Sequence, residues 1–86
     1  MTLSFVEAEI EAVARTMSVV TGKNLVIDPR VRGQITLSTE RPVAPEVAFQ
    51  QFVAALRMQN FAIVESSGIT KIVPESEAKV QGGTVI

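Results

Sequence analysis

The sequence predicts a small α+β domain in the order strand–helix–strand, strand–helix–strand, strand. Three observations predict it: short segments alternate apolar and polar residues, two longer segments repeat apolar residues at helical spacing, and glycine or proline separates most of them. The 86 residues, 47% of them hydrophobic, suffice for one domain with one core. We therefore expect two βαβ-like halves that share this core, followed by a last strand.

The first half begins with a short strand that continues into a helix. Residues 2–6 alternate, which places Leu3 and Phe5 on one face of the strand. From Ala8 the spacing becomes helical, and Gly22 stands where a glycine commonly ends a helix. The apolar positions at helical spacing are Ile10, Val13, Ala14, Met17 and either Val20 or Thr21.

The middle of the chain predicts two strands and a second helix. Leu25-Val26-Ile27 is an apolar strand that Asp28-Pro29 ends, and residues 34–39 alternate as a half-buried strand. Pro45 suits the first position of a helix that runs to about Met58. Its apolar stripe is wide, with members Val47, Ala48, Phe49, Phe52, Val53 and Leu56. We expect this width to bring the helix into contact with more than one layer.

The last part predicts a β-hairpin and one helical turn. Residues 61–64 and 69–73 are the expected strands, and Ser66-Ser67-Gly68 suits the turn between them. Pro74 ends the second strand, and residues 75–79 could form a single helical turn.

The domain is expected at residues 1–79. Residues 80–86 contain two consecutive glycines and are interpreted as a linker to a following domain. The N-terminus begins directly with alternating residues, so the signal peptide of an exported protein would have to precede this sequence. No apolar run reaches about 18 residues, so no membrane-spanning helix is predicted.

The composition argues against catalysis. The sequence has no cysteine and no histidine, which removes thiol nucleophiles, disulfides, thiolate metal sites and histidine acid–base chemistry. A serine–lysine pair is not excluded, but no serine lies in a Gly-x-Ser-x-Gly elbow. Glu7 and Glu11 have a spacing that superficially suggests a hard-metal pair, but we interpret them as a solvated first helical turn. We expect no enzyme, no metal and no cofactor.

A nucleic-acid-binding domain is the alternative from another class. Lys23, Arg30, Arg32 and Arg41 lie close together in the sequence, but eight basic against nine acidic residues give the whole chain a net charge of −1. A KH-like module would need a Gly-x-x-Gly loop between helices, which the sequence lacks. Arg30 and Arg32 are more simply interpreted as hydrated residues that flank a tight turn.

A protein-binding surface is the remaining possibility. The outward positions of the first and third strands favour β structure, and no lysine guards these strand edges against pairing with a partner. These positions are Thr2, Ser4, Val6, Gln34, Thr36 and Ser38. We predict that they bind a partner by edge pairing, with Arg30 or Arg32 orienting it; the alternative is that they simply face water.

The sequence resembles the N-terminal periplasmic domain of a type II secretion secretin over roughly residues 3–80. The resemblance rests on residues 4–10, 21–37, 52–57, 61–62 and 69–79. Its most specific features are the block Asp28-Pro29-Arg30-Val31-Arg32-Gly33 and the later Lys-Ile-Val-Pro-Glu run. Three positions depart from the family pattern. Glu7 stands where Asn or Asp often caps the first helix, Ala44 where Ser is common, and Asn60 where Gly is common.

The resemblance implies two helices between two small sheets, as in the signalling domain of TonB-dependent receptors. It also implies a periplasmic portion of an outer-membrane channel, with no catalysis. The implied partners are the periplasmic domain of the inner-membrane component, neighbouring secretin subunits and possibly cargo, and we expect the isolated domain to be monomeric. The alternatives are a TonB-dependent receptor signalling domain and the equivalent secretin domain of a type III or pilus system.

Overall fold

The computed structural model describes residues 2–78 and 84–86. Their secondary structure confirms the predicted small α+β domain. The elements are β1 (Ser4–Glu9), α1 (Ile10–Thr21), β2 (Asn24–Ile27), β3 (Gln34–Ser38), α2 (Pro45–Arg57), β4 (Phe61–Ser66), β5 (Ile69–Pro74), α3 (Glu75–Ala78) and β6 (Thr84–Val85).

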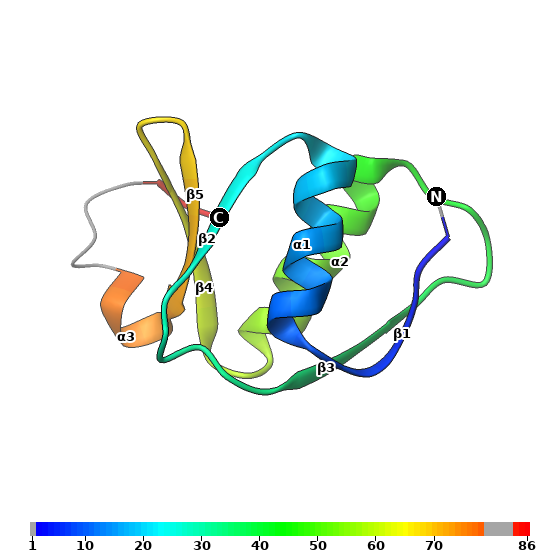
Figure 1. Ribbon diagram of the computed structural model, residues 1–86, viewed down its shortest axis with the longest axis horizontal. Coiled ribbons are helices and arrows are strands. Elements are labelled where there is room, and N and C mark those ends of the chain that lie inside the picture. The colour runs from blue at the N-terminus through cyan, green and yellow to red at the C-terminus, as the bar shows by residue number, and fades with distance from the viewer. Residues whose placement is uncertain (1, 79–83) are drawn as a thin grey trace.

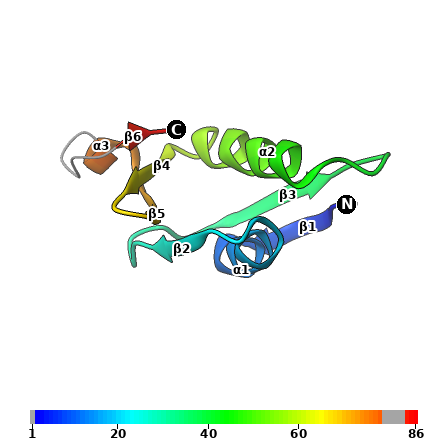
Figure 2. The same ribbon diagram turned by 90° about the horizontal axis from the view of Figure 1, so that it is seen from above.

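Helices α1 and α2 lie side by side between two sheets (Figure 1, Figure 2). Strands β1 and β3 form an antiparallel two-stranded sheet. The other sheet has the order β2-β5-β4-β6, with β2 parallel to β5 and the remaining pairs antiparallel. Each strand–helix–strand half therefore sends its two strands to different sheets. Helix α1 contacts β1 and β2, and α2 contacts β3 and β4, so each helix bridges both sheets. This confirms that α2 contacts more than one layer.

The core fills the space between the helices and the inner faces of the sheets. Its largest fully buried side chains are Phe52, Leu3, Ile10, Met17, Leu56, Ile63, Ile72 and Val13. A second, smaller cluster lies on the outer face of the four-stranded sheet, where α3 contacts β4 and β5. Its members are Ala62, Val64, Val73 and Ala78. One face of the four-stranded sheet thus packs against the helices, and the other is partly covered.

The helix ends follow the local sequence. Gly22 has a φ of 71°, a left-handed conformation that suits glycine, and its N–H donates to the Ser18 carbonyl to end α1. Pro45 opens α2, and Ala44 before it makes no side-chain cap hydrogen bond. Asn60 adopts a φ of 64° after α2, as its short polar side chain allows.

The start of the chain differs from the prediction. The strand extends to Glu9 and the helix begins at Ile10, two residues later than Ala8. A β-bulge between Phe5 and Ala8 causes the difference. The regular alternation of the sequence stops at residue 6, but the bulge shifts the register and the strand continues beyond it. The residue before the helix is Glu9, which has an extended backbone and makes no side-chain cap hydrogen bond. Glu7 lies inside the bulge with a φ of 48° rather than at the helix cap.

The C-terminal part agrees with the predicted hairpin and extends it. The turn residues Ser67 and Gly68 both have positive φ, 53° and 77°, which is typical of a two-residue hairpin turn. Beyond it, Thr84 and Val85 pair with β4 as β6, so two of the seven residues interpreted as a linker form a strand. The other linker residues at 80–83, including Gly82-Gly83, and residue 79 of the predicted helical turn lie outside the described residues.

Candidate partner-binding surface

The outer face of the β1–β3 sheet brings together most of the predicted surface residues. Ile35 and Leu37 point inward and are buried, which leaves Gln34, Thr36 and Ser38 exposed on the other face. In the antiparallel register Ser4 lies opposite Ser38, so strand β1 adds another exposed serine to the same face. The result is a bare sheet face of small polar side chains.

The bulge in β1 lies on this face. Val6 is 73% exposed, a large value for an apolar side chain. The backbone N–H of Glu7 donates to Oγ1 of Thr36 at 3.0 Å, so the Thr36 hydroxyl already holds the bulge in place. Thr2 is exposed two residues before β1, next to the buried Leu3. Thr36 therefore supports the bulge. The alternating sequence predicted only that its side chain faces outward.

Both strands of this small sheet have an open edge in the part of the chain that the structure describes, because β1 and β3 pair only with each other. The N–H of Thr39 donates to the Leu3 carbonyl, so it points toward β1. Successive residues of a strand alternate their N–H groups between its two sides. The N–H groups of Thr36 and Ser38 therefore point away from β1, toward the open edge of β3. Such unpaired N–H groups can donate hydrogen bonds to a strand that a partner adds at this edge.

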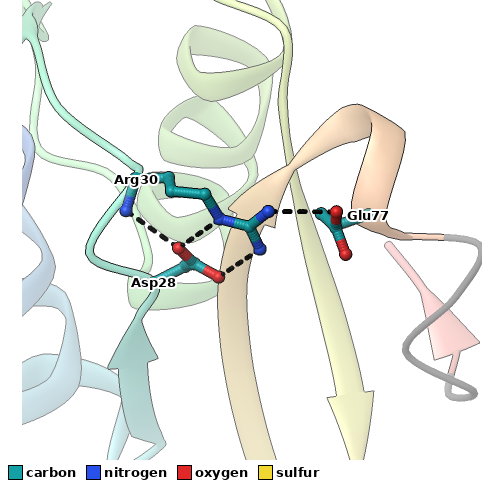
Figure 3. A network of polar contacts seen from close by, with 3 residues as sticks. All are labelled: Asp28, Arg30 and Glu77. Carbon is teal, nitrogen blue, oxygen red and sulfur yellow. Dashed lines mark hydrogen bonds and ion pairs between the residues drawn. The ribbon is translucent and has the colours of Figure 1, made fainter.

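Arg30 lies apart from this face, in a polar network with α3 (Figure 3). Its Nη2 is 2.8 Å from Asp28 Oδ2, its Nε donates to Asp28 Oδ1 at 3.0 Å, and its Nη1 is 3.0 Å from Glu77 Oε1. The Arg30 side chain and backbone N–H together hold the pKa of Asp28 at about 2, below its usual value. The two carboxylates raise the pKa of Arg30 above its ordinary value. Arg30 thus ties the β2–β3 loop to α3.

Arg32 lies nearer to the predicted surface. It lines a cavity of about 290 Å³ together with Glu9 and Gln34, at the end of the β1–β3 sheet. Its Nε donates to the Pro29 carbonyl at 3.4 Å, and among the described residues no carboxylate lies within 4.0 Å of its guanidinium group. Arg32 therefore lies at the end of the β1–β3 sheet, whereas Arg30 is paired with Asp28 and Glu77. The tight turn that both were expected to flank is present, closed by the Val31 N–H on the Asp28 carbonyl.

The described residues contain no group of three or more His, Cys, Asp or Glu side chains that could hold a metal ion. In the same part of the chain, no helix is long and apolar enough to cross a membrane. Two further ion pairs lie elsewhere on the surface: Lys23 pairs with Glu65 at 3.1 Å, and Arg15 with Glu11 at 3.1 Å. The most distinctive surface is thus a polar sheet with open edges, which suits protein binding.

The sequence did not predict two features of these surfaces. Glu77 is 47 residues from Arg30, and no local pattern indicates that they meet. The β1 bulge was missed because the alternation of residues 2–6 shows no irregularity before the helical pattern begins. The positive φ of a glutamate at position 7 has no sequence signature, since glutamate rarely adopts it.

Comparison with known proteins defines the family. Residues 3–72 match the model of the GspD-like N0 domain. Secretin XcpQ of Pseudomonas aeruginosa is 29% identical over 82 residues, which cover 95% of this chain and 12% of XcpQ. Secretin XpsD of Xanthomonas campestris is 35% identical over 78 residues, 90% of this chain and 10% of XpsD. The chain thus spans about a tenth of the length of these relatives.

Solved structures show the same fold. The N-terminal domain of XcpQ superposes with a TM-score of 0.82 at 27% identity, over 87% of this chain and 36% of that one. A GspC–GspD complex from enterotoxigenic Escherichia coli superposes with a TM-score of 0.76 at 18% identity, over 88% of this chain and 57% of that one. A third structure is the type II secretion outer membrane complex of Klebsiella pneumoniae, with PulD, PulS and the PulC HR domain. It superposes with a TM-score of 0.69 at 32% identity, over 81% of this chain and 12% of that one.

The fold, with two helices between two small sheets, defines a small α+β module of the N0 class. More narrowly, the chain belongs to the family of N0 domains of GspD-like type II secretion secretins, the periplasmic N0 part of an outer-membrane secretin.

Proposed function

We propose that this domain is the docking module through which an outer-membrane secretin channel for type II protein secretion binds the periplasmic domain of the inner-membrane component. The observation that carries the proposal is the β1–β3 sheet. Its outer face is bare, its residues are polar and uncharged at Ser4, Thr36 and Ser38, and its two edges are open among the described residues. A partner strand can pair with such an edge without displacing any part of the domain.

Two related structures support this choice of partner. The complex from enterotoxigenic Escherichia coli contains GspC with GspD, and the Klebsiella pneumoniae complex contains the PulC HR domain with PulD. The partner of this chain is accordingly proposed to be the corresponding inner-membrane component. Neighbouring secretin subunits and secreted cargo are further proposed partners of the full-length channel, with residues 80–86 leading to its next domain.

The contribution of the two arginines to binding is unequal in this proposal. Arg32 is exposed, and no carboxylate of the described residues pairs with it, so it can orient a partner with an acidic side chain. Arg30 has its guanidinium group engaged by Asp28 and Glu77, so it shapes the loop instead. The same pairing, together with the net charge of −1, leaves little basic surface for nucleic acid.

An amide NMR titration of the isolated domain tests the proposal. The added protein is the periplasmic domain of the inner-membrane component encoded beside this secretin. We expect shifts confined to β1, β3 and the bulge. Shifts elsewhere, or none at about 1 mM partner, would refute docking by this sheet.

Ser38→Pro gives a sharper test of edge pairing. It removes an N–H that points to the open edge of β3 and spares the hydrogen bonds to β1. We expect roughly tenfold weaker binding, the effect of about one lost hydrogen bond. Ser38→Ala keeps the N–H and is the matched control, which should bind like the parent. If both folded variants bind alike, the edge of β3 is not used.

A further inference from the structure

A further open strand edge lies in the other sheet. Strand β2 is the first strand in the order β2-β5-β4-β6, so one of its sides faces no strand among the described residues. Asp28 donates its N–H to the Ile72 carbonyl of β5, so Asp28 and, by alternation, Val26 turn their backbone groups toward β5. The N–H and C=O groups of Leu25 and Ile27 therefore point to the unpaired side.

A groove of about 610 Å³ runs along this side, between β2 and α1. Figure 1 shows β2 at the margin of its sheet, with α1 beside it. The residues that form the apolar floor of the groove are Ala14, Leu25, Ile27 and Val31. The floor thus combines an apolar surface with four backbone groups able to form hydrogen bonds, which is the chemistry that an added strand requires.

Val26 extends this surface to the opposite face of the strand. Its side chain is half exposed, on the face of β2 that points away from the core. A strand laid beside β2 would place one set of alternate side chains in the groove and the other set next to Val26. Apolar or β-branched residues in the added strand would therefore find neighbours on both faces.

The charges at the rim indicate what else the occupant carries. Glu11 is paired with Arg15 at 3.1 Å, and Asp28 is paired with Arg30 at 2.8 Å. Arg32, which also lines the groove, is the charged lining residue that no carboxylate of the described residues approaches within 4.0 Å. A carboxylate from the occupant would complement it.

We propose that this groove binds an extended segment of a partner protein, which adds as a strand beside β2. The segment carries apolar or β-branched residues in its strand and an acidic residue that reaches Arg32. The edge of β2 is distinct from the edges of the β1–β3 sheet, although Arg32 lines both this groove and the cavity at the end of that sheet. The proposal does not depend on the docking function proposed above.

The first test uses a defined probe. It is an acetylated heptapeptide that alternates valine and threonine and ends with aspartate, titrated into the ¹⁵N-labelled domain up to about 1 mM. We expect shifts at Leu25, Ile27 and the adjoining face of α1, with β1 and β3 unchanged. The matched probes replace the central valine with proline, which should abolish binding, and the aspartate with lysine, which should weaken it about fivefold.

Variants of the domain provide the complementary test. Ile27→Pro removes a donor from the open side of β2 and spares the bonds to β5, but it also removes a side chain that packs against the core. Provided that circular dichroism shows a folded variant, binding should be lost. Arg32→Glu changes only an exposed side chain and should reverse the preference for aspartate over lysine. It keeps the proposal testable if Ile27→Pro does not fold.

Three results would overturn the proposal. The first is no shift near β2 with the aspartate probe, and the second is equal binding of the proline probe. The third is a concentration-dependent shift of β2 residues without any peptide, which would show that a second copy of this chain occupies the groove. The docking function is tested by amide shifts of β1 and β3 with a different partner. Its failure can therefore be distinguished from failure of this proposal.

Discussion

The two sheets of this domain differ in how they are covered. The four-stranded sheet has a packed inner face, and part of its outer face is covered by α3 with a cluster of buried side chains that includes Val64 and Val73. Ion pairs also join its margins, Lys23 to Glu65 and Arg30 to Glu77. The β1–β3 sheet has only its inner face covered, and Val6 is 73% exposed on the bulge. One sheet thus buries side chains on both faces, and the other leaves its outer face exposed among the described residues.

Removal of the side chain that supports both sheets should have the largest effect. Phe52 is fully buried in α2, which contacts a strand of each sheet. Phe52→Ala should reduce the free energy of unfolding by about 3–5 kcal/mol, through lost burial and the cavity that remains. Urea denaturation followed by circular dichroism measures the change. A loss under about 1 kcal/mol would mean that the sheets are stabilised independently of α2.

The outer faces themselves can be compared directly with the same substitution. Val64→Ala in the covered cluster should cost roughly 2 kcal/mol, since two methyl groups leave a buried site. Val6→Ala on the bare sheet should change the stability by less than about 0.5 kcal/mol. Urea midpoints of the two variants provide the comparison. Equal losses would contradict the difference between the two faces.

The bulge can be weakened at the hydroxyl that holds it. Thr36→Val keeps the shape of the side chain and removes the acceptor of the Glu7 N–H. We expect a loss of about 0.5–1 kcal/mol, since the bond is exposed. Thr36→Ser keeps the hydroxyl and is the control, although it has a smaller side chain. Amide hydrogen exchange at Glu7 should accelerate in the valine variant, and unchanged exchange would show that Thr36 does not hold the bulge.

The smallest expected effect is at the margin of the four-stranded sheet and depends on pH. The folded pKa of Asp28 is about 2, below its usual value of 3.8, so the unfolded chain binds more protons between these two values. The contribution of Asp28 to stability is present above pH 4 and is lost as the pH falls toward 2. Asp28→Asn should therefore flatten the loss of stability across this interval in acid titrations followed by circular dichroism. Parallel curves for parent and variant would argue against the Arg30–Asp28 contact.

Local patterns predicted the elements well because their causes are local. Gly22 and Asn60 both adopt the left-handed conformation expected after a helix, and Pro45 opens α2. The alternation of residues 34–39 placed Ile35 and Leu37 inside and Thr36 and Ser38 outside. For the same reason, the exposed surface of β3 could be predicted residue by residue.

The pairing of strands could not be predicted from these patterns. Nothing in Leu25-Val26-Ile27 indicates that β2 is a marginal strand, because an apolar triplet is equally typical of a strand between two neighbours. The separation of Arg30 from Arg32 also depends on a distant residue, Glu77 in α3. The arrangement of two helices between two sheets was predicted by the family resemblance rather than by the periodicity.

The bridging of both sheets by each helix has a mechanical consequence. A closely packed interior has low compressibility, so a pull on β1 or β3 passes through α1 and α2 to the four-stranded sheet with little change of length. The domain, with a longest dimension of 37 Å, should behave as a stiff coupling. A partner held by one sheet would then keep a fixed orientation relative to the other sheet.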